Sequence, residues 1–185
     1  MSRVMGRADL LALTVGIVVA AVVTAVPMPG VTAQAAAAFV IAAMIGWIAW
    51  QDLRTFTLPD GPLVALALTG AALRLSQAFD LPQEALVIAI DVVLCGGALL
   101  AIREGYYRWK GVDGLGFGDV KLAAACGVLV GVTGFAHALL AASAFGIAVV
   151  LALSLRSGAV AIDRLPFGAL LAPACGLVWV LSSLT

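Results

Sequence analysis

The chain has 185 residues, of which 64% are hydrophobic and only 11% are charged. Soluble domains contain roughly 45–50% apolar and about 25% charged residues, so this composition excludes a soluble globular protein. Ten basic and ten acidic side chains leave a formal net charge of zero, which gives no reason to expect a nucleic-acid partner. The composition predicts a membrane protein with a single membrane-embedded domain, residues 1–185, and no soluble domain.

Apolar stretches long enough to cross a bilayer recur along the whole chain. Prolines, glycines and charged residues separate them, for example at Pro27, Pro59 and Pro82. The pattern predicts an all-α transmembrane helix bundle of about seven spans, within a range of six to eight. The predicted spans are 8–26, 33–51, 62–79, 85–102, 119–132, 135–155 and 167–184.

The basic residues predict the orientation of this bundle, because Lys and Arg concentrate in short cytoplasmic loops. With seven spans, Arg74 alone falls on one side of the membrane, and the other nine basic residues fall on the opposite side. The N-terminus is therefore predicted to be cytoplasmic. Asp52 follows the second predicted span, and Asp119 begins the fifth. Both acids are predicted to lie on the cytoplasmic side, where they can meet.

Asp52 and Asp119 are the candidate catalytic residues. An acid held at membrane depth costs about 2.5–3.5 kcal/mol on insertion scales, so such acids are functional candidates by default. Two carboxyls that approach each other cannot both ionise cheaply, so the pair is expected to share a proton. The ionised member can then take a proton from water while the other donates to a scissile carbonyl. This arrangement predicts peptide hydrolysis without a covalent intermediate.

The glycines before Asp119 have two explanations from the residues alone. Gly116 and Gly118 lack side chains, so an extended substrate could approach the backbone beside Asp119 and bind there. The simpler explanation is that they form a turn and that Asp119 caps the helix that follows. Both explanations stay open at this stage.

Three further charged residues have alternative roles. Asp60 is expected to cap the third span, with a supporting role in substrate binding as the alternative. Lys121 is expected to reach the membrane interface, or else to hold Asp119 near the substrate. Asp91 falls well inside the fourth span; it either pairs with a polar group of a neighbouring helix or shows that this span is misplaced.

Metal and cofactor sites are not predicted. The three cysteines all lie inside apolar stretches and form no Cys-x-x-Cys pair, and His137 is the only histidine. The cysteines are expected to be packing residues, and the chemistry is expected to need no cofactor.

At these residues the chain resembles a known family. The run Gly-Phe-Gly-Asp at 116–119 is similar to the Gly-x-Gly-Asp motif of the type IV prepilin peptidases. Asp52 followed by Leu-Pro-Asp at 58–60 resembles that family's other aspartate motif. Pro-Phe-Gly at 166–168 is similar to an element near the start of the last span in bacterial members. The three elements occur in the family's order over residues 47–176.

The resemblance implies a multi-pass enzyme of the bacterial inner membrane that cleaves the basic leader of prepilins or pseudopilins at the cytoplasmic face. It implies Asp52 and Asp119 as the catalytic pair of an aspartic endopeptidase, with no metal. Larger members also methylate the new N-terminus through an inserted domain with paired Cys-x-x-Cys motifs. No such cysteine pair is found here, so the short, peptidase-only form is expected.

Two functions of other classes stay open. A proton-coupled carrier could relay protons through Asp52, Asp91 and Asp119, although the chain shows no obvious inverted repeat. A non-catalytic assembly protein could use the small residues of its helices for packing. A carrier predicts sensitivity to a proton gradient, and an assembly protein predicts tolerance of Asp52→Asn.

Overall fold

The structure is a computed structural model that describes residues 31–157 and 166–184. These residues form helices and no strand, so the prediction of a helical membrane protein is confirmed for this part of the chain. The predicted span at 8–26 lies outside the described residues. The helices are α2 (Val31–Thr55), α3 (Asp60–Gln77), α4 (Leu81–Lys110), α5 (Phe117–Ser157) and α6 (Phe167–Leu184).

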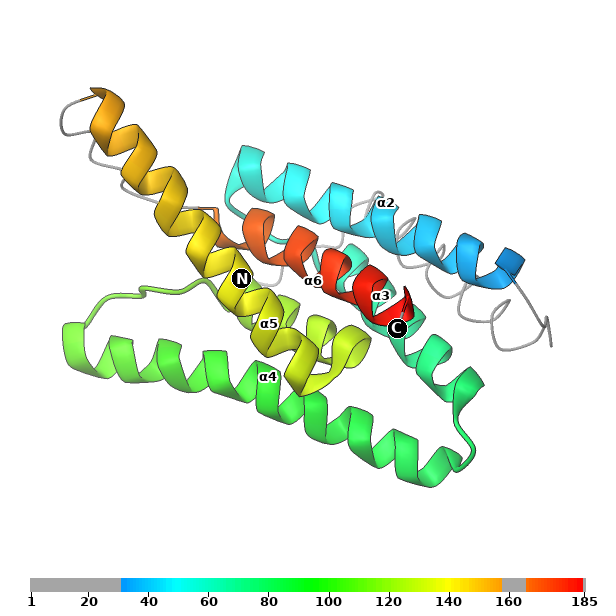
Figure 1. Ribbon diagram of the computed structural model, residues 1–185. Helices are drawn as coiled ribbons and strands as arrows, with labels where there is room; N and C mark the ends of the chain where they lie inside the picture. Colours follow the sequence, from blue (N-terminus) through cyan, green and yellow to red (C-terminus); the bar gives the residue numbers. More distant parts are fainter. Residues whose placement is uncertain (1–30, 158–165, 185) are drawn as a thin grey trace.

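Helix α5 lies at the centre of the bundle. It packs against α3, α4 and α6, while α2 packs against α3 and α6. Figure 1 shows α5 crossing between α4 on one side and the α2–α6 pair on the other. The buried side chains are mainly small or branched and include all three cysteines, which are free and buried as expected. Large apolar side chains such as Phe39 and Leu140 point outward, as expected where the surroundings are lipid.

Among the described residues, three segments are long and apolar enough to cross a membrane: Ala35–Thr55, Leu81–Lys110 and Phe117–Ala152. The apolar segment Phe167–Ser183 is shorter. The number of seven spans and the cytoplasmic N-terminus stay predictions.

Helix α4 is longer than the sequence predicted. The predicted span ended at residue 102, but the helix continues to Lys110 and has 30 residues. A helix can continue after its sequence becomes polar. Glu104 and Arg108 stabilise the added turns, because they lie one turn apart and form an ion pair. Gly111 ends the helix in a left-handed conformation with φ 71°, and its N–H bonds to the Tyr107 carbonyl.

Helix α5 combines the predicted fifth and sixth spans across a sharp break. The sequence predicted a turn at 131–134, and the backbone leaves the helical region at Gly131, with φ 69° and ψ 175°. Figure 1 shows the axis of α5 changing direction sharply at this level. Positive φ costs glycine little, which explains why the break occurs at this residue.

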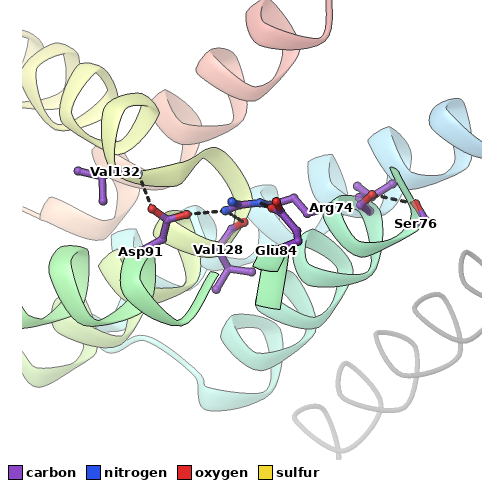
Figure 2. Close-up of polar contacts among 7 residues, drawn as sticks. Arg74, Ser76, Glu84, Asp91, Val128 and Val132 are labelled. Atoms are coloured by element: carbon purple, nitrogen blue, oxygen red, sulfur yellow. Dashed lines mark hydrogen bonds and ion pairs between the residues drawn. The ribbon is translucent and has the colours of Figure 1, made fainter. Parts of the chain in front are cut away.

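The same break explains Asp91, which is buried in α4. Its carboxylate accepts the Val132 N–H at 3.2 Å, where the second half of α5 begins. It also pairs with Arg74 of α3 at 2.6 Å, and Arg74 in turn bonds Glu84 at 2.8 Å and the Val128 carbonyl at 3.3 Å. Figure 2 shows these contacts joining three helices. Asp91 therefore pairs with a neighbouring helix, and its span was not misplaced.

Candidate active site

Asp52 lies in the last turn of α2 and is only 5% exposed. Its carboxyl Oδ2 accepts a hydrogen bond of 2.8 Å from the backbone N–H of Ala169, in the first turn of α6. The N-terminus of a helix carries unsatisfied N–H groups and a partial positive charge, so it is a favourable partner for a carboxylate. The start of α6 thus fixes the position of a buried acid that the sequence had singled out.

Gly168 allows this contact. A Cβ atom at this position would lie 3.1 Å from Asp52 Oδ2 and 2.9 Å from Leu58 Cδ2. A residue with a side chain would push α6 away from α2, so the Pro-Phe-Gly element is explained by close packing beside Asp52. The sequence analysis noted this element but gave its glycine no role.

Asp119 lies in the first turn of α5, at the end of the glycine-rich segment. Its side chain is half-buried. Its own N–H donates to the Gly116 carbonyl at 3.1 Å, and a Cβ at Gly116 would be 3.3 Å from Asp119 Oδ2. The segment therefore folds tightly against the carboxyl that follows it.

Asp52 and Asp119 line the same cavity, which has a volume of about 750 Å³. We call it the Asp52–Asp119 cavity. The two residues reach this cavity from different helices, Asp52 from α2 and Asp119 from α5. The cavity lies at the end of the bundle where α2 finishes and α5 and α6 begin. The residues lining it are Asp52, Phe56, Arg103, Tyr106, Asp113, Gly114, Leu115, Gly116, Phe117, Asp119, Pro166 and Phe167.

Leu58 joins the three sequence elements beneath this cavity. A Cβ at Gly118 would lie 3.0 Å from Leu58 Cβ, and one at Gly168 would lie 2.9 Å from its Cδ2. Leu58 is thus packed between two motif glycines that are distant in the sequence. Gly118 itself does not line the cavity, whereas Gly116 does.

Asp60 and Lys121 lie elsewhere. Asp60 is not the cap of α3, because Pro59 occupies that position without a side-chain bond and Asp60 is the first helical residue. The Asp60 carboxylate pairs with the Lys121 ammonium at 2.6 Å, so Lys121 binds Asp60 and not Asp119. Both side chains are exposed and line a separate, mostly apolar hollow between α3, α4 and α5.

Arg103 and Tyr106 of α4 line the cavity, although the sequence did not place them at the site. An arginine at the end of an apolar helix looks like an orientation signal, which hid its other contacts. The only sequence feature pointing to the pair was its place just before the glycine-rich segment. Within the described residues, no group of three His, Cys, Asp or Glu side chains is arranged to hold a metal ion.

Comparisons with known proteins identify relatives of this chain. Residues 39–151 match the family model of the type IV leader peptidase family. The prepilin leader peptidase/N-methyltransferases of Burkholderia pseudomallei strains 1026b and K96243 are each 31% identical to the chain over 143 residues. The alignment covers 77% of this chain and 45% of each relative, so the chain spans about half the length of the curated relatives it matches. No solved structure matches.

Proposed function

The chain belongs to the type IV leader peptidase family, and we propose that it is an aspartic endopeptidase that removes the leader peptide of prepilins or pseudopilins. The observation that carries the proposal is the cavity shared by Asp52 and Asp119, which reach it from different helices. The curated relatives are named for the same leader cleavage. The aspartic chemistry and the prepilin substrate are what we propose for this chain.

In the proposed mechanism, the two carboxyls hold one proton and a water molecule between them. The ionised carboxylate, which we call the first carboxyl, removes a proton from the water as the water oxygen attacks the scissile carbonyl carbon. The protonated carboxyl donates its proton to the carbonyl oxygen. The carbon–nitrogen bond of the tetrahedral intermediate then breaks, and the leaving amine takes up the proton from the first carboxyl. One hydroxyl of the intermediate returns its proton to the second carboxylate as the carbonyl re-forms, which restores the starting state of the pair. Because Asp52 Oδ2 already accepts the Ala169 N–H, we assign the contact with the water to Asp52 Oδ1.

We propose that the cavity faces the cytoplasm in a multi-pass protein of the bacterial inner membrane. Nine of the ten basic residues fall on the side of the membrane that the sequence assigns to Asp52 and Asp119. Arg74, the tenth, lies in the last turn of α3. The partners of the chain are then the membrane and a prepilin or pseudopilin whose leader is read from the cytoplasm.

For substrate contacts, we propose Gly116 first, because it lines the cavity beside Asp119 and leaves room for an extended backbone. Gly118 contributes by letting Leu58 pack beneath the site. Asp60 and Lys121 are proposed only as contacts for the more distant part of a substrate, because their ion pair does not line the cavity.

The test is cleavage of a co-expressed type IV prepilin, followed by gel shift, at matched membrane levels of each variant. Asp52→Asn and Asp119→Asn are each expected to lower cleavage about 100-fold or more, since general acid–base catalysis contributes roughly 10²–10⁴-fold. Asparagine keeps the shape of the side chain but cannot exchange the proton.

Asp80→Asn is the matched control. Asp80 is exposed and caps α4 by accepting the Gln83 N–H, a role that asparagine fills equally well, so cleavage should be unchanged. If both site variants still cleave, the assignment of the acids is wrong. If the wild type cleaves no prepilin tried, the carrier and assembly functions gain ground.

A further inference from the structure

The segment between α4 and α5 carries Asp119 into the cavity but contains no regular structure of its own. It begins after Gly111, which ends α4, and it leads into Phe117, the first residue of α5. A segment of this kind holds one conformation only if neighbouring side chains bind it. The position of Asp119 therefore depends on what holds residues 112–116.

Arg103 binds this segment at two points from the last third of α4. Its Nε donates to the Leu115 carbonyl at 3.1 Å, and its Nη2 pairs with Asp113 Oδ1 at 2.7 Å. The guanidinium also lies 5.9 Å from the centre of the Phe117 ring, within the range of a cation–π contact. The side chain of Arg103 is 24% exposed and that of Asp113 is 60% exposed, so the bond to the Leu115 carbonyl is better shielded from water than the bond to Asp113.

Tyr106 holds the residue between these two points. A Cβ at Gly114 would lie 2.5 Å from two atoms of the Tyr106 ring, so the segment lies flat against the ring. Two side chains one turn apart on α4 therefore contact three successive residues: Asp113, Gly114 and Leu115. Gly116 follows at once, and its carbonyl accepts the Asp119 N–H.

We propose that Arg103 is a positioning residue that holds the glycine-rich segment against α4 and thereby sets Asp119 opposite Asp52. The inference rests on the proposed function, since it assigns Arg103 a part in the same reaction. The planar guanidinium can hold a carbonyl and a carboxylate at the same time, which the single ammonium of lysine does less well. A displacement of about 1 Å at a reacting group can lower the rate about 100-fold, so even a modest loosening should be measurable.

The first experiment measures the steady-state kinetics of prepilin cleavage. Arg103→Gln should lower kcat about 10- to 100-fold and change KM by less than about threefold, because it displaces a reacting group and leaves most of the cavity intact. Arg103→Lys and Asp113→Asn each retain one of the two contacts and should fall in between. Arg108→Gln is the matched control, because Arg108 lies on the same helix and, among the described residues, bonds Glu104 in an exposed pair.

The second experiment measures hydrogen exchange of residues 112–119 in the purified, detergent-solubilised protein, without substrate. Exchange there should be about tenfold faster or more in Arg103→Gln, as expected for loss of a charge-assisted hydrogen bond, and unchanged in Arg108→Gln. If Arg103→Gln does not fold, Asp113→Asn gives the same comparison with a smaller change.

The two measurements separate this inference from the proposed function. Full kcat or unchanged exchange in Arg103→Gln would overturn the positioning role while prepilin cleavage by the wild type stands. Faster exchange in a protein that cleaves no prepilin would support the hold on the segment and refute the proposed reaction.

Discussion

At the scale of single residues, the site depends on close contacts around two carboxyls. Asp52 is held by a backbone N–H from α6, and Asp119 by the tight segment that precedes it. Within the described part of the chain neither carboxyl forms a direct ion pair, and Lys121, the nearest basic residue in sequence to Asp119, is bound to Asp60. The basic groups are thus kept from forming an ion pair that would remove a carboxyl from acid–base chemistry.

Gly168→Ala tests the contact between α6 and Asp52. The added Cβ would lie 3.1 Å from Asp52 Oδ2, so the carboxyl or the helix must shift by a few tenths of an ångström. We expect prepilin cleavage to fall about tenfold, because the reacting group is displaced. The measurement is kcat at matched protein levels, with thermal unfolding recorded for the same samples.

Gly97→Ala is the control, since a Cβ there meets no atom within 4 Å and alanine favours the helix. An unchanged rate in Gly168→Ala would mean that the start of α6 does not set the position of Asp52.

The ion pair of Asp60 and Lys121 is expected to add little to stability. Its side chains are 62% and 42% exposed, and exposed pairs contribute about 0–1 kcal/mol. Lys121→Gln should therefore change the free energy of unfolding by less than about 1 kcal/mol, measured by denaturation in detergent. A clear rise in KM for prepilin in this variant would instead support Lys121 as a substrate contact, and an unchanged KM would remove it from the site.

At the scale of elements, the break at Gly131 divides α5 into two halves with different directions. The half that begins at Phe117 carries Asp119, and the half after Gly131 returns through the bundle to pack with α6. Asp91 accepts the Val132 N–H at the start of the second half, while Arg74 donates to the Val128 carbonyl near the end of the first half. The network also commits Asp91 to fixed partners, which weakens its case as a relay in a proton carrier.

Asp91→Ala tests this network. Removing the carboxylate leaves the Val132 N–H without its bond and Arg74 with Glu84 as its remaining acid partner. We expect a loss of about 1–3 kcal/mol in the free energy of unfolding, the usual cost of an unsatisfied buried group. Thermal or denaturant unfolding in detergent measures it.

Glu104→Gln serves for comparison, because it breaks an exposed pair within one helix and should cost less than about 0.5 kcal/mol. Equal stability of the two variants would show that the buried network does not hold the break in α5.

At the scale of the whole molecule, α4 sets the relation between the membrane and the site. Its 30 residues correspond to about 45 Å, more than the ~30 Å of a hydrocarbon core. We expect the end with Arg103 and Tyr106 to extend beyond the core, because the exposed Trp109 and Lys110 beside them suit the headgroup region. The Asp52–Asp119 cavity is thereby expected at the membrane surface, where a peptide from the cytoplasm can reach it.

Cysteine labelling tests this orientation. Phe79, between α3 and α4, and Trp109, near the end of α4, are both fully accessible or nearly so, at 110% and 77% exposed. A membrane-impermeant maleimide should label Phe79→Cys in intact spheroplasts and Trp109→Cys only in inverted vesicles. The three native cysteines are buried, so the background should be low. The reverse pattern would invert the topology, and labelling of both from one side would mean that α4 does not cross.

Much of this protein could be predicted from its sequence. Composition and the recurrence of apolar stretches determined a helical membrane protein, because in lipid the backbone must satisfy its own hydrogen bonds. Local chemistry indicated the break near Gly131 and singled out Asp52 and Asp119. The end of α4 was predicted less well, because the polar residues after 102 are as compatible with a helix as with a loop.

Only the tertiary structure decided which residues meet. The bond from Ala169 to Asp52 and the packing of Leu58 between Gly118 and Gly168 join distant parts of the chain. The hold of Arg103 on the segment before Asp119 is nearer in sequence, but it depends on how that segment folds back along α4. The assignment of Asp91 to Arg74, and of Lys121 to Asp60, was equally undecided. Periodicity and propensity describe each helix by itself, whereas these contacts depend on the register and rotation of one helix against another, which packing alone determines.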